Sequence, residues 1–232
     1  MNQRRAGICG KASITSQVYN RYMKLTKYDH ACFTVEKDSY ILVVDPGDLT
    51  DNLVVTPNID AVVITHKHAD HFEPELLELI YKSNPNAKIF APAEVIELLS
   101  LPNLVTTKHN DSMRIGPFDL KFYGTNHQKP FDDSPTIENT GVLINDIIYH
   151  PGDSFFVPEN MNIDILMLPV SGSWMKASMA RDFLNAVHPK VAIPTHDAIL
   201  SQKGQAQVDK YWPVHAKKIN CTYQRLNAPL EI

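Results

Sequence analysis

Hydrophobic and polar positions along this chain fall into short runs that predict alternating strands and helices. Met23–Glu36 and Tyr40–Val44 have a strand-like pattern and are separated by a polar turn at 37–39. Ile59–Thr65 is a nearly continuous apolar run, which is typical of a strand covered on both faces. The chain is therefore expected to begin with a sheet.

Helical spacing appears next and then alternates with further strands. Pro74 to Ile80 predicts a helix, and a second helix is predicted from Pro92 to Leu99. A third helix is predicted over 179–187, and strands over 89–91, 119–123, 140–144, 147–149, 163–168 and 191–193. Gly204–Lys218 also has helical spacing, but Pro213 is expected to kink or break that helix before a closing strand. This alternation predicts an α/β fold.

Length and composition place this pattern in one packed domain. The chain has 232 residues, of which 44% are hydrophobic and 21% charged, as in ordinary globular proteins. We predict a domain over residues 23–232 after an N-terminal extension over 1–22. The first 28 residues contain no Asp or Glu, as in some transit peptides, but a non-targeting extension is the preferred interpretation.

Charge and cysteine content narrow the expected partners. The net charge of -4 provides no bulk attraction for nucleic acid, and no apolar run approaches the length of a membrane span. Cys9, Cys32 and Cys221 form no Cys-x-x-Cys pair, which indicates a reducing compartment, with Cys32 a core residue. We expect a cytoplasmic protein that acts on a small molecule, with no membrane or nucleic-acid partner, and a homo-oligomer is left open.

A histidine-rich run carries the candidate chemistry. His66, His68, Asp70 and His71 follow directly after the apolar run Ile59–Thr65. Side chains at these spacings cannot share one face of a strand or a regular helix, so they must converge from a loop. Imidazole nitrogen and carboxylate oxygen are ligands of zinc, manganese and iron, and the absence of a nearby cysteine argues against a sulfur-rich structural zinc site. This run therefore predicts a metal site.

The pattern His-x-His-x-Asp-His resembles the motif of the metallo-β-lactamase superfamily. The resemblance implies a four-layer αββα sandwich and two divalent metal ions, with zinc preferred and manganese or iron as alternatives. It assigns one ion to two histidines of the motif and a third histidine, and the other ion to the Asp-His pair and a last histidine, with a carboxylate bridging the ions. The ligands matched in this way are His66, His68 and His127 for the first ion, Asp70, His71 and His196 for the second, and Asp153 as the bridge.

The span from Met23 onward is similar to one branch of that superfamily, the small hydrolases that include the L-ascorbate-6-phosphate lactonase-like proteins. The similarity lies in the stretches 27–33, 45–47, 168–172 and 194–197, although Asp29 stands where relatives usually have glycine. It implies a hydrolase in which hydroxide bridging the ions attacks an ester, lactone or phosphodiester bond of a small anionic substrate. Asp70 is expected to be catalytic by orienting this nucleophile or moving its proton.

Residues beside the expected ligands are candidates for other roles. Asp45 is predicted to support a metal-binding histidine, with a turn cap as the alternative. Substrate contacts are predicted from loop residues, whose alternative is ordinary solvation and packing: His30, Lys129, Ser171, Trp174 and Lys176. The other hypothesis for the whole protein is a metal-binding sensor or interaction protein of the same fold without turnover.

Overall fold

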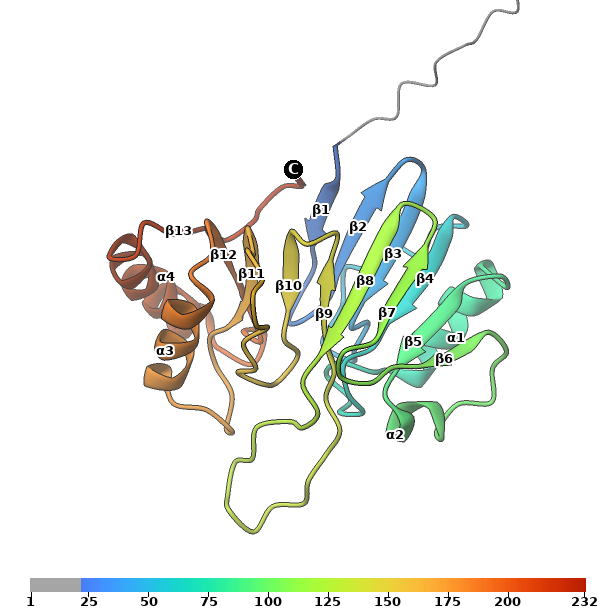
Figure 1. Ribbon diagram of the computed structural model, residues 1–232, viewed down its shortest axis with the longest axis horizontal. Helices are drawn as coiled ribbons and strands as arrows, with labels where there is room; N and C mark the ends of the chain where they lie inside the picture. Colours follow the sequence, from blue (N-terminus) through green and yellow to red (C-terminus); the bar gives the residue numbers. More distant parts are fainter. Residues whose placement is uncertain (1–21) are drawn as a thin grey trace, which may run out of the picture.

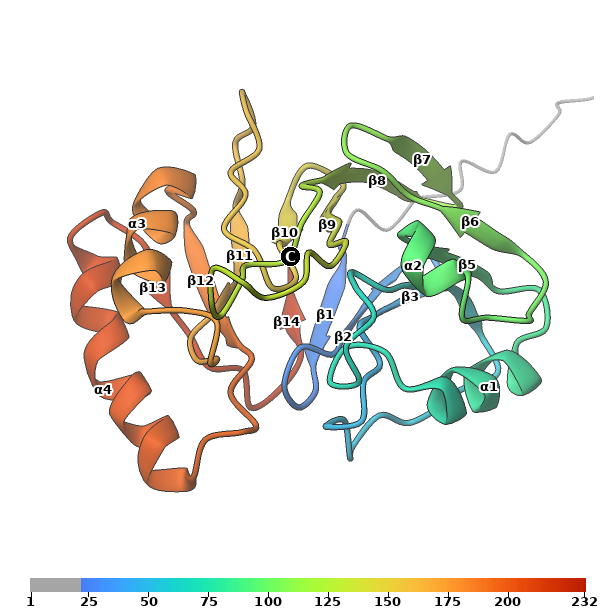
Figure 2. The same cartoon turned by 90° about the horizontal axis from the view of Figure 1, so that it is seen from below.

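The computed structural model describes residues 22–232, so the predicted extension lies almost wholly outside the described residues. Two seven-stranded sheets face each other, and helices cover the outer face of each (Figures 1 and 2). One sheet carries α1 (Pro74–Ser83) and α2 (Ala93–Ile96), and the other carries α3 (Ala177–Val187) and α4 (Gln202–Lys217). The predicted α/β class and four-layer αββα sandwich are confirmed.

The first sheet combines an antiparallel and a parallel half. Its order is β14-β1-β2-β3-β4-β5-β6, in which β14 to β3 pair antiparallel and β3 to β6 pair parallel. The strands are β1 (Lys24–Lys27), β2 (Phe33–Lys37), β3 (Tyr40–Val44), β4 (Ile59–Val63), β5 (Lys88–Ala91), β6 (Leu104–Thr106) and β14 (Leu230–Glu231).

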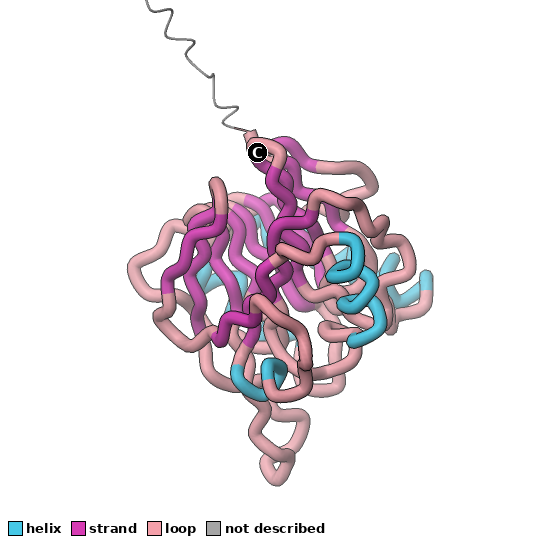
Figure 3. The backbone as a smooth tube through the Cα atoms, turned by 90° about the vertical axis from the view of Figure 1, so that its right-hand side faces the viewer, coloured by secondary structure: helices cyan, strands magenta, loops and turns pink. Residues whose placement is uncertain are grey.

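The second sheet has the same mixed character. Its order is β13-β12-β11-β10-β9-β8-β7, with parallel pairing from β13 to β10 and antiparallel pairing from β10 to β7. The strands are β7 (Ser112–Ile115), β8 (Phe118–Tyr123), β9 (Gly141–Ile144), β10 (Ile148–His150), β11 (Ile165–Pro169), β12 (Val191–Thr195) and β13 (Thr222–Tyr223). The loop over residues 124–140, between β8 and β9, extends well beyond the sheets (Figures 1 and 3).

Three apolar clusters fill the three interfaces between the layers. Phe33 and Phe122 belong to the cluster between the sheets, and Leu77 lies in the cluster under α1. Trp212 belongs to the cluster under α3 and α4. Cys32 is fully buried, as predicted. Burial of these side chains holds the two helix-covered sheets against each other.

The structure corrects three of the predicted elements. The run Met23–Glu36 is two antiparallel strands, because the backbone turns between Tyr28 and Cys32 and closes with a hydrogen bond of 2.9 Å. The second predicted helix is shorter than expected and consists of α2 alone. After Ile96 the α-helical hydrogen bonds give way to bonds of the 3₁₀ type, from the amides of Leu98 and Leu99 to the carbonyls three residues earlier. α4 continues through Pro213, since Trp212 and Ala216 on either side are buried against the core.

A further result concerns membranes. Among residues 22–232, no helix combines the length and the apolar character needed to cross a lipid bilayer.

Candidate metal centre

The predicted metal-binding run forms a loop after β4, at the end of the parallel half of the first sheet. A second loop, after β3, holds it in place through a hydrogen bond of 2.8 Å from the Asp48 amide to the Ala69 carbonyl. Gly47 in that second loop touches the backbone of Asp70, since a Cβ atom at Gly47 would lie only 2.0 Å from the Asp70 carbonyl oxygen. The shape of the loop is thus fixed by backbone contacts rather than by helical or strand geometry.

The other predicted ligands follow strands of the second sheet. His127 follows β8, Asp153 follows β10 and His196 follows β12. The amide of Asp153 donates to the side-chain oxygen of Asn139 at 3.0 Å, and the amide of His196 donates to the carbonyl of His30 at 3.1 Å. Both ligand-bearing turns are therefore anchored to other segments of the chain.

The structure brings all seven predicted ligands together in two adjacent groups. In each group one ligand atom per residue lies within 4.8 Å of the others. The first group consists of His66, His68, His127 and Asp153, and the second of His30, Asp70, His71 and His196.

Asp153 lies between these two groups. Its Oδ2 atom is 3.2 Å from Nε2 of His127 in the first group and 2.9 Å from Nε2 of His196 in the second. Its Oδ1 atom is 3.1 Å from Nε2 of His71. One carboxylate thus contacts histidines of both groups, which is the arrangement expected of a bridging ligand.

Asp45 supports His71 from behind. Its Oδ2 atom accepts hydrogen bonds from Nδ1 of His71 and Nε2 of His150, each at 2.7 Å, and from the hydroxyl of Thr65 at 2.8 Å. Its Oδ1 atom accepts from the Thr65 amide at 2.8 Å. Because Nδ1 of His71 donates to Asp45, Nε2 is the ring nitrogen directed at the site. The structure therefore brings Asp45 into the supporting position that the sequence predicts, and it assigns His150 to the same network.

His30 is buried and does not reach a substrate. Its side chain is fully buried, and Nε2 lies 3.0 Å from Oδ2 of Asp70. Its ring packs against that of His196, with centroids 4.1 Å apart. The predicted contact with substrate is corrected accordingly, because the turn between β1 and β2 inserts His30 behind Asp70.

The clustered charges shift the protonation of the site. Burial would raise the pKa of Asp153, but His71 and His196 hold that pKa well below its usual range. Burial lowers the pKa of His66 well below its usual value, so this imidazole is neutral and free to act as a ligand. His196 shows the opposite balance, because Asp153 and Asp70 outweigh burial and raise its pKa to about 9.

These residues fit divalent metal ions. Nε2 of His71, Oδ1 of Asp153 and Nε2 of His196 are buried and have no hydrogen-bond partner among the described residues, although they lie within 3.1 Å of opposing atoms. Buried polar atoms are normally satisfied, so this set of unpartnered nitrogen and oxygen atoms calls for a shared ligand. Imidazole and carboxylate without thiolate suit zinc, manganese or iron.

A cavity of about 480 Å³ opens directly onto both ligand groups. Of the predicted substrate contacts, Lys129 and Trp174 line it. Ser171 instead donates its hydroxyl to the carbonyl of His196, and Lys176 occupies the N-cap position of α3 and does not line the cavity. The other lining residues were not predicted from the sequence, because they lie in loops without a periodic pattern: Pro130, Ser134, Pro135, Ile137, Ser173 and Ile199.

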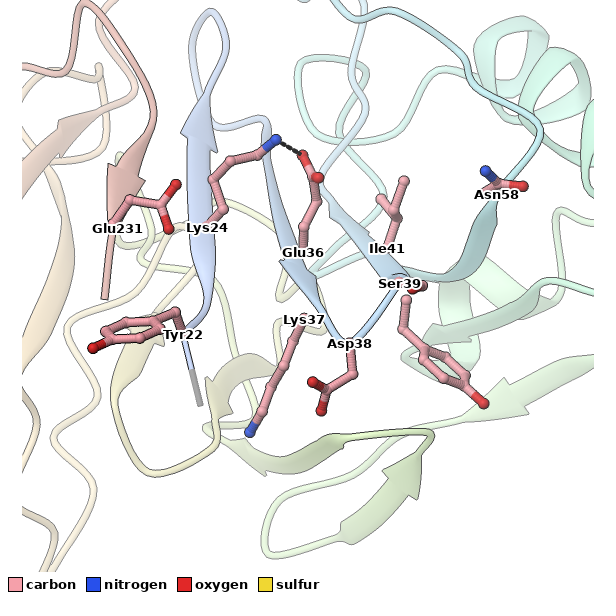
Figure 4. Close-up of a pocket in the computed structure, with 10 residues that line it drawn as sticks. Tyr22, Lys24, Glu36, Lys37, Asp38, Ser39, Ile41, Asn58 and Glu231 are labelled. Carbon is pink, nitrogen blue, oxygen red and sulfur yellow. Dashed lines mark ion pairs between the residues drawn. The ribbon is translucent and has the colours of Figure 1, made fainter. Parts of the chain in front are cut away.

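A second cavity, of about 390 Å³, lies at the other end of the first sheet (Figure 4). It is bordered by the turn between β2 and β3, whereas the metal-binding loops follow the opposite ends of β3 and β4. Lys24 and Glu36, which both line this cavity, form an ion pair of 2.7 Å, and no histidine lines it. This cavity therefore lacks the ligand chemistry of the first.

Known proteins are similar to this chain in sequence and in fold. A model of the beta-lactamase superfamily domain matches residues 24–196. Protein Rv0786c of Mycobacterium tuberculosis is 32% identical over 184 residues, which cover 77% of this chain and 86% of that protein. The UPF0173 metal-dependent hydrolase Ta0764 of Thermoplasma acidophilum is 29% identical over 190 residues, covering 75% of this chain and 83% of the relative.

Among solved structures, Igni18, a metallo hydrolase from the hyperthermophilic archaeon Ignicoccus hospitalis, superposes with a TM-score of 0.69 at 20% identity. The match covers 91% of this chain and 98% of that one, and shows a common fold. The similarity to L-ascorbate-6-phosphate lactonase-like proteins stays a prediction. The matching domain model, the relatives and the fold together show that this chain belongs to the metallo-β-lactamase superfamily of metal-dependent hydrolases.

Proposed function

We propose that the protein is a dinuclear metal-dependent hydrolase that cleaves an ester, lactone or phosphodiester bond of a small anionic substrate. The position of Asp153 carries this proposal, because its carboxylate lies within 3.2 Å of Nε2 of both His127 and His196. A carboxylate shared between two ligand groups is what a pair of closely spaced ions requires. Ta0764, a metal-dependent hydrolase by name, supports the same class of reaction.

Each residue of the two groups has a defined task in this proposal. His66, His68 and His127 would hold one ion, and Asp70, His71 and His196 the other, with Asp153 shared. When bound, such ions lower the pKa of a coordinated water toward neutrality and polarise the oxygen of the bond under attack.

Asp70 links the ligand groups to the cavity. Its side chain is 25% exposed and lines the cavity, while Oδ2 is held 3.0 Å from Nε2 of His30. Surrounding imidazoles hold the pKa of Asp70 well below its usual range, so the carboxylate is ionised at neutral pH. An ionised carboxylate at this border can orient the attacking water by accepting a hydrogen bond from it, and His30 fixes the carboxylate in place.

Metal analysis combined with turnover tests this function. The full chain, reconstituted with zinc, manganese or iron, is expected to retain two ions and to hydrolyse members of a panel of lactones, esters and phosphodiesters. Asp70→Ala should lower turnover at least 100-fold, because removing a group that acts in the reaction costs about that much. The matched control Asp119→Ala removes an exposed carboxylate of β8 and should change neither metal content nor turnover.

Three results would contradict the proposal. Full retention of turnover in Asp70→Ala would remove Asp70 from the mechanism. Two retained ions without turnover on the whole panel would instead favour the metal-binding sensor. A single ion per chain would contradict the dinuclear assignment.

A further inference from the structure

The wall of the cavity beside the ligands is largely apolar. Five of its lining residues outside the ligand groups have apolar side chains: Pro130, Pro135, Ile137, Trp174 and Ile199. They come from the long loop between β8 and β9 and from the segments that follow β11 and β12. Apolar walls with a few placed polar groups are the general form of sites for small organic ligands.

Trp174 brings this apolar wall into contact with both ligand groups. Its ring centroid lies 5.6 Å from that of His127 and 5.5 Å from that of His196, each in an edge-on arrangement. Gly172 makes room for the indole, because a Cβ atom at Gly172 would lie 2.7 Å from Nε1 of Trp174. An apolar surface therefore begins directly beside the atoms that would carry out the reaction.

Ile199 extends the same wall to the solvent. Its side chain lines the cavity, and yet the residue is 54% exposed. Phe131, next to the lining residue Pro130, is 73% exposed. Large apolar side chains exposed around a cavity mark a surface that an apolar ligand covers.

Outside the ligand groups, the cavity wall carries a single charged side chain. Lys129 is the only lysine or arginine that lines the cavity, and it forms no ion pair with any residue between 22 and 232. Arginine, the residue suited to bidentate binding of phosphate groups, does not line it. One ammonium group matches one anionic group on a ligand rather than a polyanion.

We propose that the substrate is amphipathic: an apolar acyl or aryl group of several carbons adjoins the scissile bond, and a single anionic group pairs with Lys129. This inference rests on the proposed hydrolase function. For an ester or lactone, water adds its oxygen to the acyl carbon, the bond from that carbon to the alkoxy oxygen breaks, and the alcohol oxygen takes up a proton. The apolar group packs on Trp174 and Ile199 throughout.

Binding of product-like carboxylates tests the inference without relying on turnover. The probes are acetate, butyrate, hexanoate and octanoate, added to the metal-reconstituted full chain. Intrinsic fluorescence reports binding, because one of the two tryptophans lies in the cavity and the other, Trp212, is buried under α4. The Trp174→Phe variant supplies the background. Affinity is expected to rise about fourfold per methylene from butyrate to hexanoate, since burying one methylene corresponds to about 0.8 kcal/mol.

Variants assign this chain-length dependence to the cavity wall. Ile199→Ala should reduce hexanoate affinity about five- to tenfold and leave acetate affinity unchanged, and its exposed position keeps the fold intact. Val214→Ala is the matched control, because Val214 is 60% exposed on α4 and does not line the cavity. Lys129→Met should weaken every carboxylate by a similar factor of about two to five. Hexyl phosphate distinguishes a phosphate from a carboxylate as the preferred anion.

The outcomes separate this inference from the proposed function. Affinity that does not depend on chain length, or an equal effect of Ile199→Ala and Val214→Ala, overturns the amphipathic substrate. If lactones and esters are hydrolysed with no preference for longer chains, the hydrolase function stands and this inference fails. If affinity rises with chain length and no substrate is turned over, the apolar ligand site stands and the hydrolase function fails.

Discussion

Asp45→Asn is the substitution that best tests how the protein prepares the site for metal. The Asp45 carboxylate is fully buried and accepts four hydrogen bonds, three of them at Oδ2 from Thr65, His71 and His150. The residue has a positive φ of 45°, a conformation that asparagine adopts as readily as aspartate. The substitution therefore changes the side chain's charge and hydrogen bonding without straining the backbone.

The magnitude of the effect follows from the donors that surround Asp45. An asparagine amide placed with its NH₂ at Oδ2 opposes three donors, and the flipped amide opposes the Thr65 amide, whose bond to Oδ1 is 2.8 Å. Each of the two amide orientations therefore leaves at least one buried donor unsatisfied, which costs about 1–3 kcal/mol of folding stability. Loss of the carboxylate that orients a metal-binding histidine lowers metal affinity by about 10- to 100-fold.

Competition with a chromophoric chelator measures this affinity, and urea unfolding of the metal-free chain measures the stability term separately. Asp60→Asn is the matched control, because Asp60 accepts a backbone hydrogen bond of 2.9 Å from Ile41 in the same sheet, far from the ligands. That variant should bind metal as the unchanged protein does. Metal affinity of Asp45→Asn within twofold of the unchanged protein would refute the supporting role and leave Asp45 as a stabilising residue only.

Three further predictions concern the stability of the protein: two buried or partly buried cations and the effect of metal removal. Burial lowers the pKa of Lys27 from 10.5 to about 8, so between these values the unfolded chain holds a proton on Lys27 that the folded chain lacks, and the contribution of Lys27 to stability rises with pH. The difference in urea unfolding stability between the unchanged protein and Lys27→Met should therefore rise from pH 8 to 10, by up to about 1.4 kcal/mol per pH unit, and an unchanged difference would contradict the shift. Arg225→Met should lower the free energy of unfolding by about 1–3 kcal/mol, because Arg225 forms ion pairs with Asp197, which follows the predicted ligand His196, and with Asp209 of α4. An unchanged midpoint of urea unfolding would contradict this. Metal removal by chelation should lower the melting temperature, since a ligand at 100 times its dissociation constant adds about 2.7 kcal/mol; equal melting with and without metal would argue against a site formed in the folded state.

Many of the strands and helices could be predicted from the sequence, because the spacing of hydrophobic residues that indicates them lies within a short stretch of chain. The buried run that ends in β4 and the apolar stripe of α1 have strong periodicity, and both elements form where the pattern predicts them. The short edge strands β6 and β7 were missed, since three or four residues at a sheet edge carry little alternation. The turn at 28–32 was missed although its polar Tyr28-Asp29-His30 run was a signal within the predicted strand.

The candidate site divides in the same way. The resemblance to the superfamily motif assigned His127, Asp153 and His196, and each of them follows a strand of the second sheet, where ligand sites of α/β sheets gather. The burial of His30 behind Asp70 was not predictable, since it depends on a contact between the turn after β1 and the backbone of His196, about 166 positions along. Ile199 likewise joins the cavity through loop packing that no periodic pattern records.

The ligands come from both sheets, which explains why patterns within one stretch of sequence predict only part of the site. The run that contains His66 belongs to the first sheet, whereas Asp153 and His196 belong to the second, and each ligand group draws residues from both sheets. Asp45 at the end of β3 and His150 in β10 join the same two sheets through a 2.7 Å hydrogen bond beneath the ligands. A pair of ions at this position would therefore be held across the sandwich interface, so that the packing between the sheets and the geometry of the ligands constrain each other.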